Sequence, residues 1–140
     1  MTVDAIKFYI TQQFENINVI EVDGDLFFMH NGNDKMPFAT IVVKDNEYDN
    51  VSNLDREGFY RLNIGIDKST FMSMFEGLTE KKGIGAYLES GIDFTKTDTL
   101  FPHPVYGSMY WVSVVNPSEK TFEELKGYLD WGYGKVAKGE

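Results

Sequence analysis

The strongest constraint on how this chain can fold is a pair of short apolar runs joined by an aspartate–glycine turn. The runs cover residues 19–22 and 26–29, and Asp23-Gly24-Asp25 separates them. Asp-Gly between two apolar runs is a signal for a β-hairpin, because aspartate and glycine both tolerate the positive φ angles of a tight turn. We therefore predict an antiparallel strand pair in the N-terminal part of the chain.

Three further segments have the pattern of strands. Residues 38–43 form an apolar run, residues 59–66 alternate in polarity, and residues 110–115 are rich in aromatic and β-branched side chains. Successive side chains of a strand point to opposite faces, so Arg61 and Asn63 are expected to share one face. Together with the hairpin, these segments predict a sheet.

Capping residues mark the predicted helices. Thr2 can cap a helix at the N-terminus, and Asp67 or Ser69 begins a short one. The segment Thr121–Glu124 has the capping-box spacing of a final helix. The order α-β-β-β-β-α-β-α with short connections is typical of an antiparallel sheet with helices on one side. We predict one compact α+β domain over residues 1–140, with a mainly antiparallel sheet and its helices packed on one face.

Charge and composition argue against several partners. The chain has 22 acidic and 13 basic residues, a net charge of −9, and its longest basic cluster is Lys81-Lys82. Nucleic acids and anionic membranes attract clustered positive charge, so neither is an expected partner. The absence of cysteine excludes disulfides, thiolate zinc sites and iron–sulfur clusters. Because no apolar run could span a bilayer and no signal-peptide pattern is present, the expected location is the cytoplasm.

The acidic segment after the third strand resembles the start of a calcium loop. Asp45, Glu47 and Asp49 alternate as calcium ligands do, but Asn50 stands where glycine is needed and Arg56 where a bidentate glutamate is needed. We interpret this segment as a solvated loop and predict no metal site.

Residues 77–97 contain several glycines, and their pattern fits a long loop or a helical excursion. Within them, Gly83-Ile84-Gly85-Ala86 has two of the glycines of a nucleotide-binding loop. The third glycine and the preceding strand are missing, so no nucleotide and no other cofactor is predicted.

Histidine limits the catalytic options, because the chain has only His30 and His103. His103 stands in Leu100-Phe101-Pro102-His103-Pro104-Val105-Tyr106-Gly107, where the two prolines stiffen the backbone. Such a turn can hold an imidazole and the Tyr106 hydroxyl in place for a ligand. Alternatively, His103 donates a hydrogen bond to a carbonyl and pins the turn, with Tyr106 packed beneath it.

Arg61 also has two interpretations. Its guanidinium can clamp a carboxylate or phosphate of a ligand, with Asn63 beside it. Alternatively, Arg61 forms an intramolecular ion pair with a carboxylate such as Asp55 or Asp98.

Four stretches in this order resemble an uncharacterised bacterial family of small cytoplasmic proteins, a domain of unknown function. They are Met36-Pro-Phe-Ala-Thr-Ile-Val42, Leu54-Asp-Arg56 leading to Arg61-Leu-Asn-Ile-Gly-Ile66, Pro102-His-Pro-Val-Tyr-Gly107, and Trp111 followed by Asn116-Pro-Ser118. The resemblance covers nearly the whole chain, is weakest over 77–93, and implies no activity. More distantly, the chain is similar to YjbR-like proteins, which implies a compact α+β fold. Those proteins are likened to DNA-binding domains, but the acidic charge disagrees with DNA as a partner.

No complete catalytic constellation is present, so we expect a non-enzymatic module that binds a small ligand or a protein partner. Its predicted binding residues are Arg61, Asn63, His103, Tyr106 and Trp111. The alternative is a small enzyme that uses His103 as a general acid or base, with Tyr106 and Arg61 in a shared pocket. A structural or dimerising protein is a third possibility.

Overall fold

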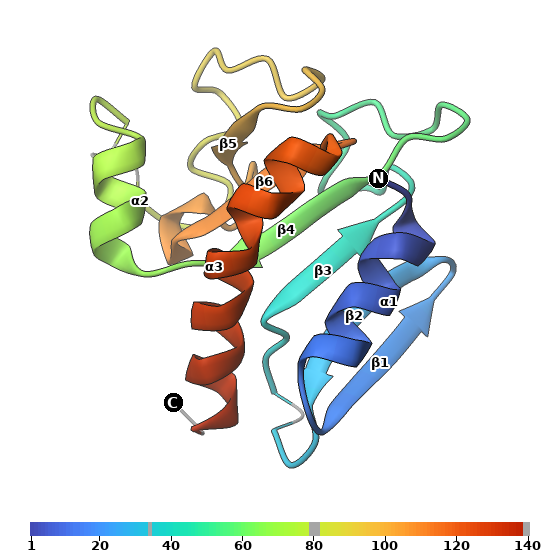
Figure 1. The fold of residues 1–140 in the computed structure, drawn as a ribbon. Helices are drawn as coiled ribbons and strands as arrows, with labels where there is room; N and C mark the ends of the chain where they lie inside the picture. Colours follow the sequence, from blue (N-terminus) through green and yellow to red (C-terminus); the bar gives the residue numbers. More distant parts are fainter. Residues whose placement is uncertain (34, 79–81, 139–140) are drawn as a thin grey trace.

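The computed structural model describes residues 1–33, 35–78 and 82–138, and its central element is an open antiparallel sheet (Figure 1). The strand order is β1-β2-β3-β4-β6-β5, and each neighbouring pair is antiparallel. The strands are β1 (Ile17–Val22), β2 (Asp25–His30), β3 (Ala39–Val42), β4 (Arg61–Gly65), β5 (Leu100–Pro102) and β6 (Trp111–Val115). The predicted α+β class with a mainly antiparallel sheet is confirmed.

The predicted hairpin connects β1 and β2. Val22 pairs with Asp25, so the turn consists of Asp23 and Gly24 alone. Their φ angles are 51° and 93°, which is the positive range that the Asp-Gly signal anticipates. The hairpin therefore follows directly from the local sequence.

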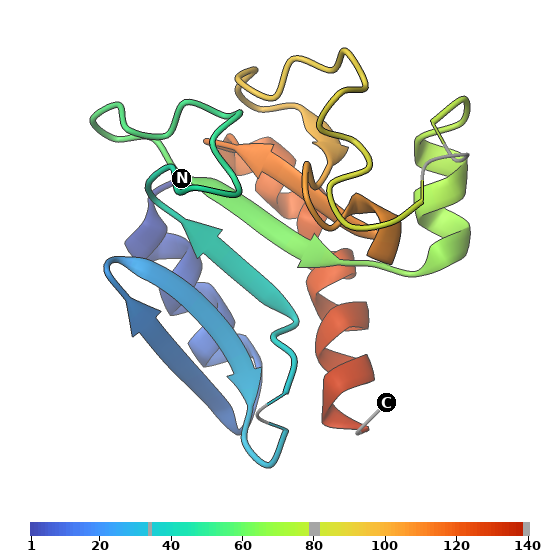
Figure 2. The ribbon, with the colours of Figure 1, turned by 180° about the vertical axis from the view of Figure 1, so that it is seen from behind.

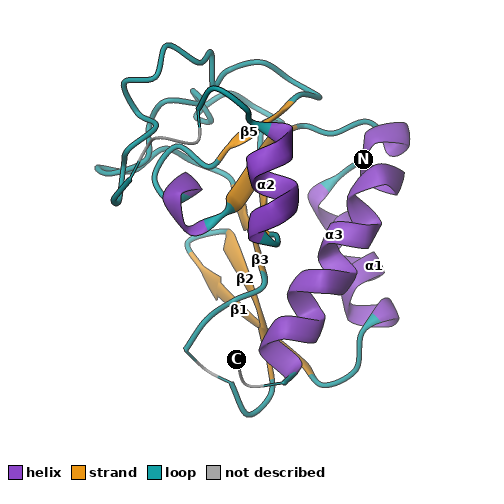
Figure 3. Cartoon of the chain, turned by 90° about the vertical axis from the view of Figure 1, so that its left-hand side faces the viewer, coloured by secondary structure: helices purple, strands orange, loops and turns teal. Residues whose placement is uncertain are grey.

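The helices of the chain are α1 (Val3–Gln13), α2 (Lys68–Met74), the 3₁₀ helix η1 (Gly107–Met109) and α3 (Glu119–Ala137). Of these, α1 and α3 cover one face of the sheet. Figure 3 shows α1 and α3 together on the side of the strands away from most of the loops. The short helix α2 follows β4 and lies beyond that end of the sheet (Figure 1).

The N-cap predictions for the first two helices are confirmed. The Thr2 hydroxyl accepts a hydrogen bond from the Ala5 amide at 3.1 Å. The Asp67 carboxylate accepts one from the Thr70 amide at 3.0 Å, so Asp67, and not Ser69, caps α2. Both side chains supply an acceptor for a first-turn amide that has no partner within the helix.

The predicted start of the last helix at Thr121 is wrong. The helix begins at Glu119, and the hydroxyl of Ser118 accepts a hydrogen bond from the Thr121 amide at 3.1 Å. Thr121 is therefore the donor inside the first turn. Ser118 directly follows Pro117, and its extended backbone (φ −71°, ψ 167°) is the conformation that an N-cap residue needs.

Strand β5 was not predicted, because its proline content suggested only a rigid turn. Leu100–Pro102 pairs with β6 at the edge of the sheet, with Pro102 opposite Val112. An edge strand tolerates a proline, because one side of it needs no ladder hydrogen bonds. Of the two alternatives for 77–97, the described residues show turns and irregular loop. Residues 79–81, including Lys81 of the basic pair, lie outside the described part.

Strand β4 is buried on both faces, as its alternation and position require. Leu62 and Ile64 belong to the apolar core beneath the helices, together with Leu125 of α3. Arg61 and Asn63 point to the opposite face, and both are fully buried. Figure 2 shows that the loop before β4 and the segment around β5 arch over the upper part of this face. The polar residues of β4 are thus covered by loops instead of water.

Candidate functional site

Arg61 lies at the centre of a buried polar network on the loop-covered face. Its side chain has no solvent exposure, and both terminal nitrogens bind the carboxylate of Asp49. Nη1 also donates to the Ser52 hydroxyl at 3.0 Å, and Nε donates to Asn63 Oδ1 at 2.9 Å. The remaining Nη2 proton is directed near His103 Nε2, 3.4 Å away. All five N–H groups of the guanidinium therefore face groups of the protein.

This geometry decides between the two interpretations of Arg61. The arginine forms an intramolecular ion pair, but its partner is Asp49 and neither Asp55 nor Asp98. Asp55 instead accepts a hydrogen bond from the Asp45 amide at 3.0 Å, and Asp98 accepts one from the Ser118 amide at 2.7 Å. Four of its five N–H groups bind Asn63, Ser52 and Asp49, and the fifth faces the His103 ring, so none is directed at a ligand site that Arg61 lines.

A row of polar side chains crosses three neighbouring strands beside Arg61. Thr40 on β3, Asn63 on β4 and Ser113 on β6 are directly opposite one another in the strand register. Asn63 donates to the Thr40 hydroxyl at 2.9 Å, and Asn63 Oδ1 accepts from the Ser113 hydroxyl at 2.6 Å. Adjacent positions of an antiparallel sheet bring side chains this close. The register of the sheet therefore builds the network.

The loop between β3 and β4, residues 43–60, positions Asp49 over the sheet. The Asn46 carboxamide oxygen accepts hydrogen bonds from the amides of Tyr48 and Asp49, at 2.8 and 2.9 Å. The Asp45 carboxylate accepts one from the Leu54 amide at 3.0 Å. The acids and amides of this segment thus fold the loop upon itself instead of all facing solvent.

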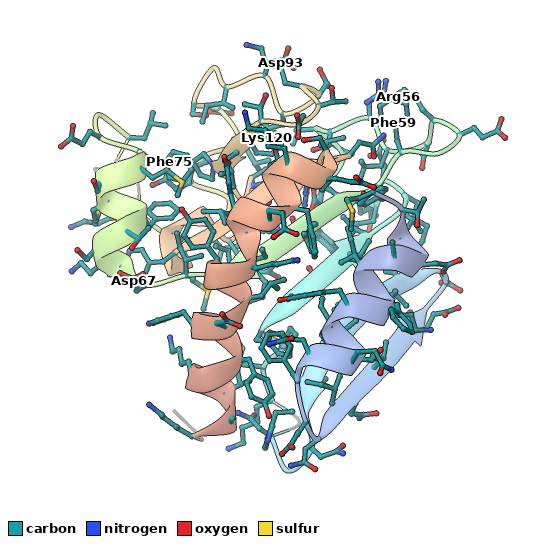
Figure 4. The ribbon with its side chains drawn as sticks, viewed as in Figure 1. Arg56, Phe59, Asp67, Phe75, Asp93 and Lys120 are labelled. Carbon is teal, nitrogen blue, oxygen red and sulfur yellow. The ribbon has the colours of Figure 1, made fainter. Side chains whose placement is uncertain are left out.

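The other arginine, Arg56, fixes the far end of the same loop. It donates to the carbonyls of Asn53 and Ser52, at 2.6 and 3.1 Å. Its guanidinium also lies 3.6 Å from the centre of the Phe59 ring, and Figure 4 shows the two side chains together at the edge of the molecule. Arg56 therefore holds the backbone of Ser52, whose hydroxyl binds Arg61.

His103 is buried, with 5% exposure, and it does pin its turn. The predicted donation from His103 to a carbonyl is wrong. Instead, Nδ1 accepts hydrogen bonds from the amides of Val105 and Tyr106, at 3.0 and 3.1 Å. Burial and the neighbouring charge of Arg61 lower the pKa of His103 to about 3, against the opposing effect of Asp49. The imidazole is therefore neutral near pH 7.

Burial also acts on Asp49, where it would by itself raise the pKa. The hydrogen bonds and the positive charge of Arg61 outweigh burial, and the pKa of Asp49 lies below its ordinary value. The ion pair is consequently charged at neutral pH. A charged pair with good geometry and further hydrogen bonds is the arrangement that a buried arginine requires.

A cavity of about 440 Å³ opens above this network. We call it the polar-face cavity. Its lining consists of Asp25, Phe27, Met36, Pro37, Thr40, Val42, Asn46, Tyr48, Asp49, Asn63, His103, Val105, Tyr106, Met109 and Trp111. Most of these side chains are apolar or aromatic, and a few polar groups of the network form its floor.

Four of the five predicted binding residues line this cavity. Asn63 belongs to its floor, and His103, Tyr106 and Trp111 come from the β5–β6 region. Tyr106 is 45% exposed, so it stands at the rim and is not packed beneath His103. The fifth predicted residue, Arg61, does not line the cavity and holds Asp49 and Asn63 from below.

Sequence reasoning missed the contributions of Thr40, Asp49 and Met36. Thr40 carried a usable signal, because it is a polar residue inside an apolar strand. Asp49 gave no such signal, since its role depends on how the loop folds over β4.

Another, smaller cavity of about 200 Å³ is lined by Met36, Pro37 and Trp111 on one side and by Trp131 of α3 on the other.

These features define a class of α+β protein. Helices cover one face of its antiparallel sheet, and the other face carries a buried polar network centred on an arginine, with a ligand-sized cavity above it.

The chain matches the family of unknown function DUF6194 over residues 1–139, and it belongs to that family. The predicted membership of a domain of unknown function is confirmed. No curated protein and no solved structure matches the chain, so the likeness to YjbR-like proteins and the bacterial origin stay predictions. Within the described ranges, no helix has the length and apolar character needed to cross a membrane.

Proposed function

We propose that this protein is a non-enzymatic binding module, acting as a single domain, whose ligand is a small molecule held in the polar-face cavity. The observation that carries the proposal is the cavity itself, because it combines about 440 Å³ with apolar walls and a hydrogen-bonded polar floor. Ligand sites in proteins are concave, span roughly 300–1,000 Å³, and combine apolar walls with a few polar groups. A cytoplasmic location stays a prediction.

The rigidity of the floor supports the same proposal. Asn63 and Ser113 are fully buried, and Thr40 and His103 are nearly so. Each is fixed by hydrogen bonds to a neighbouring strand or turn. Groups that are fixed before a ligand arrives lose little entropy when it binds.

Two observations weigh against the enzymatic alternative with His103 as general acid or base. A general base works best with a pKa near the working pH, and the pKa of His103 is lowered to about 3. In addition, Nδ1 of His103 is occupied by two backbone amides, and Arg61 does not line the cavity that it would have to share with His103.

The test is a thermal-shift screen of small molecules, followed by mapping of each hit through backbone amide shifts in NMR spectra. Tyr106→Ala removes an exposed wall of the cavity, and Val42→Phe fills part of its interior. Both should weaken a true hit. The matched control is Phe8→Ala, because Phe8 is 67% exposed on α1, on the opposite face. The control should leave binding unchanged.

The proposal fails if hits shift amides outside the cavity, or if both cavity variants bind them as tightly as the wild type does. A screen with no hit at all would also contradict it, and would favour the protein partner that the sequence leaves open. A ligand at ~100 times its dissociation constant adds about 2.7 kcal/mol to the free energy of unfolding, which a melting scan of a domain this size detects.

A further inference from the structure

The two ring nitrogens of His103 are committed to different tasks. Nδ1 accepts hydrogen bonds from the amides of Val105 and Tyr106, so it carries no proton. A neutral imidazole has one ring proton, and that proton must therefore be on Nε2. The turn consequently fixes the tautomer of His103, with Nε2 as a donor.

This Nε2–H group lacks an acceptor in the described part of the chain. The polar atom near it is Arg61 Nη2 at 3.4 Å, and a guanidinium nitrogen can donate but cannot accept. His103 is 5% exposed and lines the polar-face cavity. A buried donor without an acceptor carries a free-energy cost that a ligand oxygen can remove.

The neighbouring floor groups also offer protons. Asn63 Oδ1 already accepts from Arg61 Nε and from the Ser113 hydroxyl, so both of its lone pairs are filled. The Thr40 oxygen accepts from the Asn63 amide, and no described group accepts the Thr40 hydroxyl proton. The floor therefore suits a ligand atom that accepts hydrogen bonds.

The charges around the cavity disfavour an anion as that atom. The charged residues of the lining are Asp25 and Asp49, both acidic. Their cationic partners, Lys44 and Arg61, are not part of the lining. In the described lining, a ligand carboxylate would therefore meet two carboxylates, each already paired with its own cation, and no further cation to bind it.

We propose that the ligand is an uncharged molecule with an apolar body and a carbonyl-type oxygen, such as a ketone, an ester or an amide. The oxygen accepts the hydrogen bond of His103 Nε2–H, and the apolar body lies against Phe27, Val105 and Trp111. This inference rests on the proposed function and adds the chemical class of the ligand to it.

Three probes of equal heavy-atom count separate the possibilities: acetophenone, benzoate and isopropylbenzene. The first has an uncharged carbonyl, the second a carboxylate, and the third no acceptor. Each is titrated into the full-length protein, and binding is followed by the amide shifts of cavity residues. Acetophenone should bind about tenfold more tightly than either of the other two probes. Isopropylbenzene cannot accept the hydrogen bond, and benzoate adds charge repulsion. Acetophenone should also move the Nε2 resonance of His103.

Two substitutions of His103 divide its two tasks. His103→Asn places an oxygen near the position of Nδ1, keeps the acceptor for the two amides, and removes the Nε2 donor. This variant should fold and lose the preference for acetophenone over isopropylbenzene. His103→Gln keeps a donor near the position of Nε2, and it should retain part of that preference if it folds.

The tautomer is measured on the wild-type protein, so the proposal does not depend on the folding of any variant. Long-range ¹H–¹⁵N spectra at pH 7 should show a protonated Nε2 and an unprotonated Nδ1. A protonated Nδ1 overturns the inference. Benzoate or isopropylbenzene binding in the cavity as tightly as acetophenone also overturns it, while the proposed function stands. If none of the probes binds but another small molecule shifts the cavity amides, the chemical class is wrong and the binding module remains.

Discussion

Asp49 and Arg61 form a two-pronged ion pair that joins a loop to the middle of the sheet. Arg61 Nη1 donates to Asp49 Oδ1 at 2.9 Å, and Nη2 donates to Oδ2. The arginine side chain is fully buried, and that of Asp49 is 13% exposed. The pair closes the β3–β4 loop over β4, so the floor and one wall of the polar-face cavity depend on it.

Replacing Asp49 should therefore destabilise the protein strongly. Asp49→Asn keeps the shape of the side chain but leaves the buried guanidinium without a counter-charge. We expect a loss of about 3–5 kcal/mol in the free energy of unfolding, measured by urea denaturation. The control is Glu47→Gln in the same loop, because Glu47 is exposed and should change stability by no more than about 0.5 kcal/mol. Equal losses for the two variants would show that the ion pair does not hold the loop.

His103 should make stability depend on pH. In the unfolded chain its imidazole takes up a proton below about pH 6.5, whereas burial and the charge of Arg61 lower its pKa to about 3 in the folded protein. Between these values the unfolded state binds more protons, so the free energy of unfolding falls as the pH falls. The expected loss between pH 7 and pH 5 is on the order of 2 kcal/mol.

His103→Asn supplies the comparison for this pH effect. It keeps an acceptor for the turn amides and has no titrating group, and His30 is present in both proteins. The difference between the two pH profiles therefore isolates His103. Parallel profiles between pH 7 and pH 5 would show that the folded protein binds a proton at His103 as readily as the unfolded chain. Asp49, whose pKa is also lowered, adds a loss of the same sign below its ordinary pKa.

Two glycines of α3 should respond oppositely to alanine. A Cβ at Gly132 would lie 3.1 Å from the Gly65 carbonyl oxygen and 3.3 Å from that of Phe38, whereas a Cβ at Gly127 meets nothing within 4 Å. Gly127→Ala should raise the free energy of unfolding by about 0.5–1 kcal/mol through helix propensity. Gly132→Ala should lower it, because these two backbone carbonyls cannot shift easily. A thermal melt of each variant tests this, and a gain for Gly132→Ala would mean that α3 can move away from the sheet.

The cap of α2 offers a matched pair of small substitutions. Asp67→Ala removes the acceptor for the Thr70 amide and should cost about 1 kcal/mol. Ser69→Ala, two residues further on, removes an exposed hydroxyl and should leave stability unchanged or slightly raised. Urea denaturation of both variants shows which of the two residues, Asp67 or Ser69, caps the helix. A larger loss for Ser69→Ala would contradict the observed cap.

Local patterns predicted the elements whose geometry is decided within a few residues. Asp23-Gly24 predicted a turn with two positive φ angles, and the turn has them. The alternation of β4 placed Arg61 and Asn63 on one face, and both lie there. The start of α3 was misplaced, because Ser118 and Thr121 both suit an N-cap and the spacing to a glutamate favoured the wrong one.

The fold class, most strands and helices, and a set of residues that gather around one cavity could therefore be predicted from local patterns. Tertiary structure alone decided that Arg61 pairs with Asp49, that β5 joins the edge of the sheet, and that His103 accepts hydrogen bonds at Nδ1. The physical reason is the distance along the chain between the residues that decide each feature. Backbone angles and side-chain faces follow from neighbouring residues, whereas the partner of a buried charge depends on which loop the folded chain brings over it.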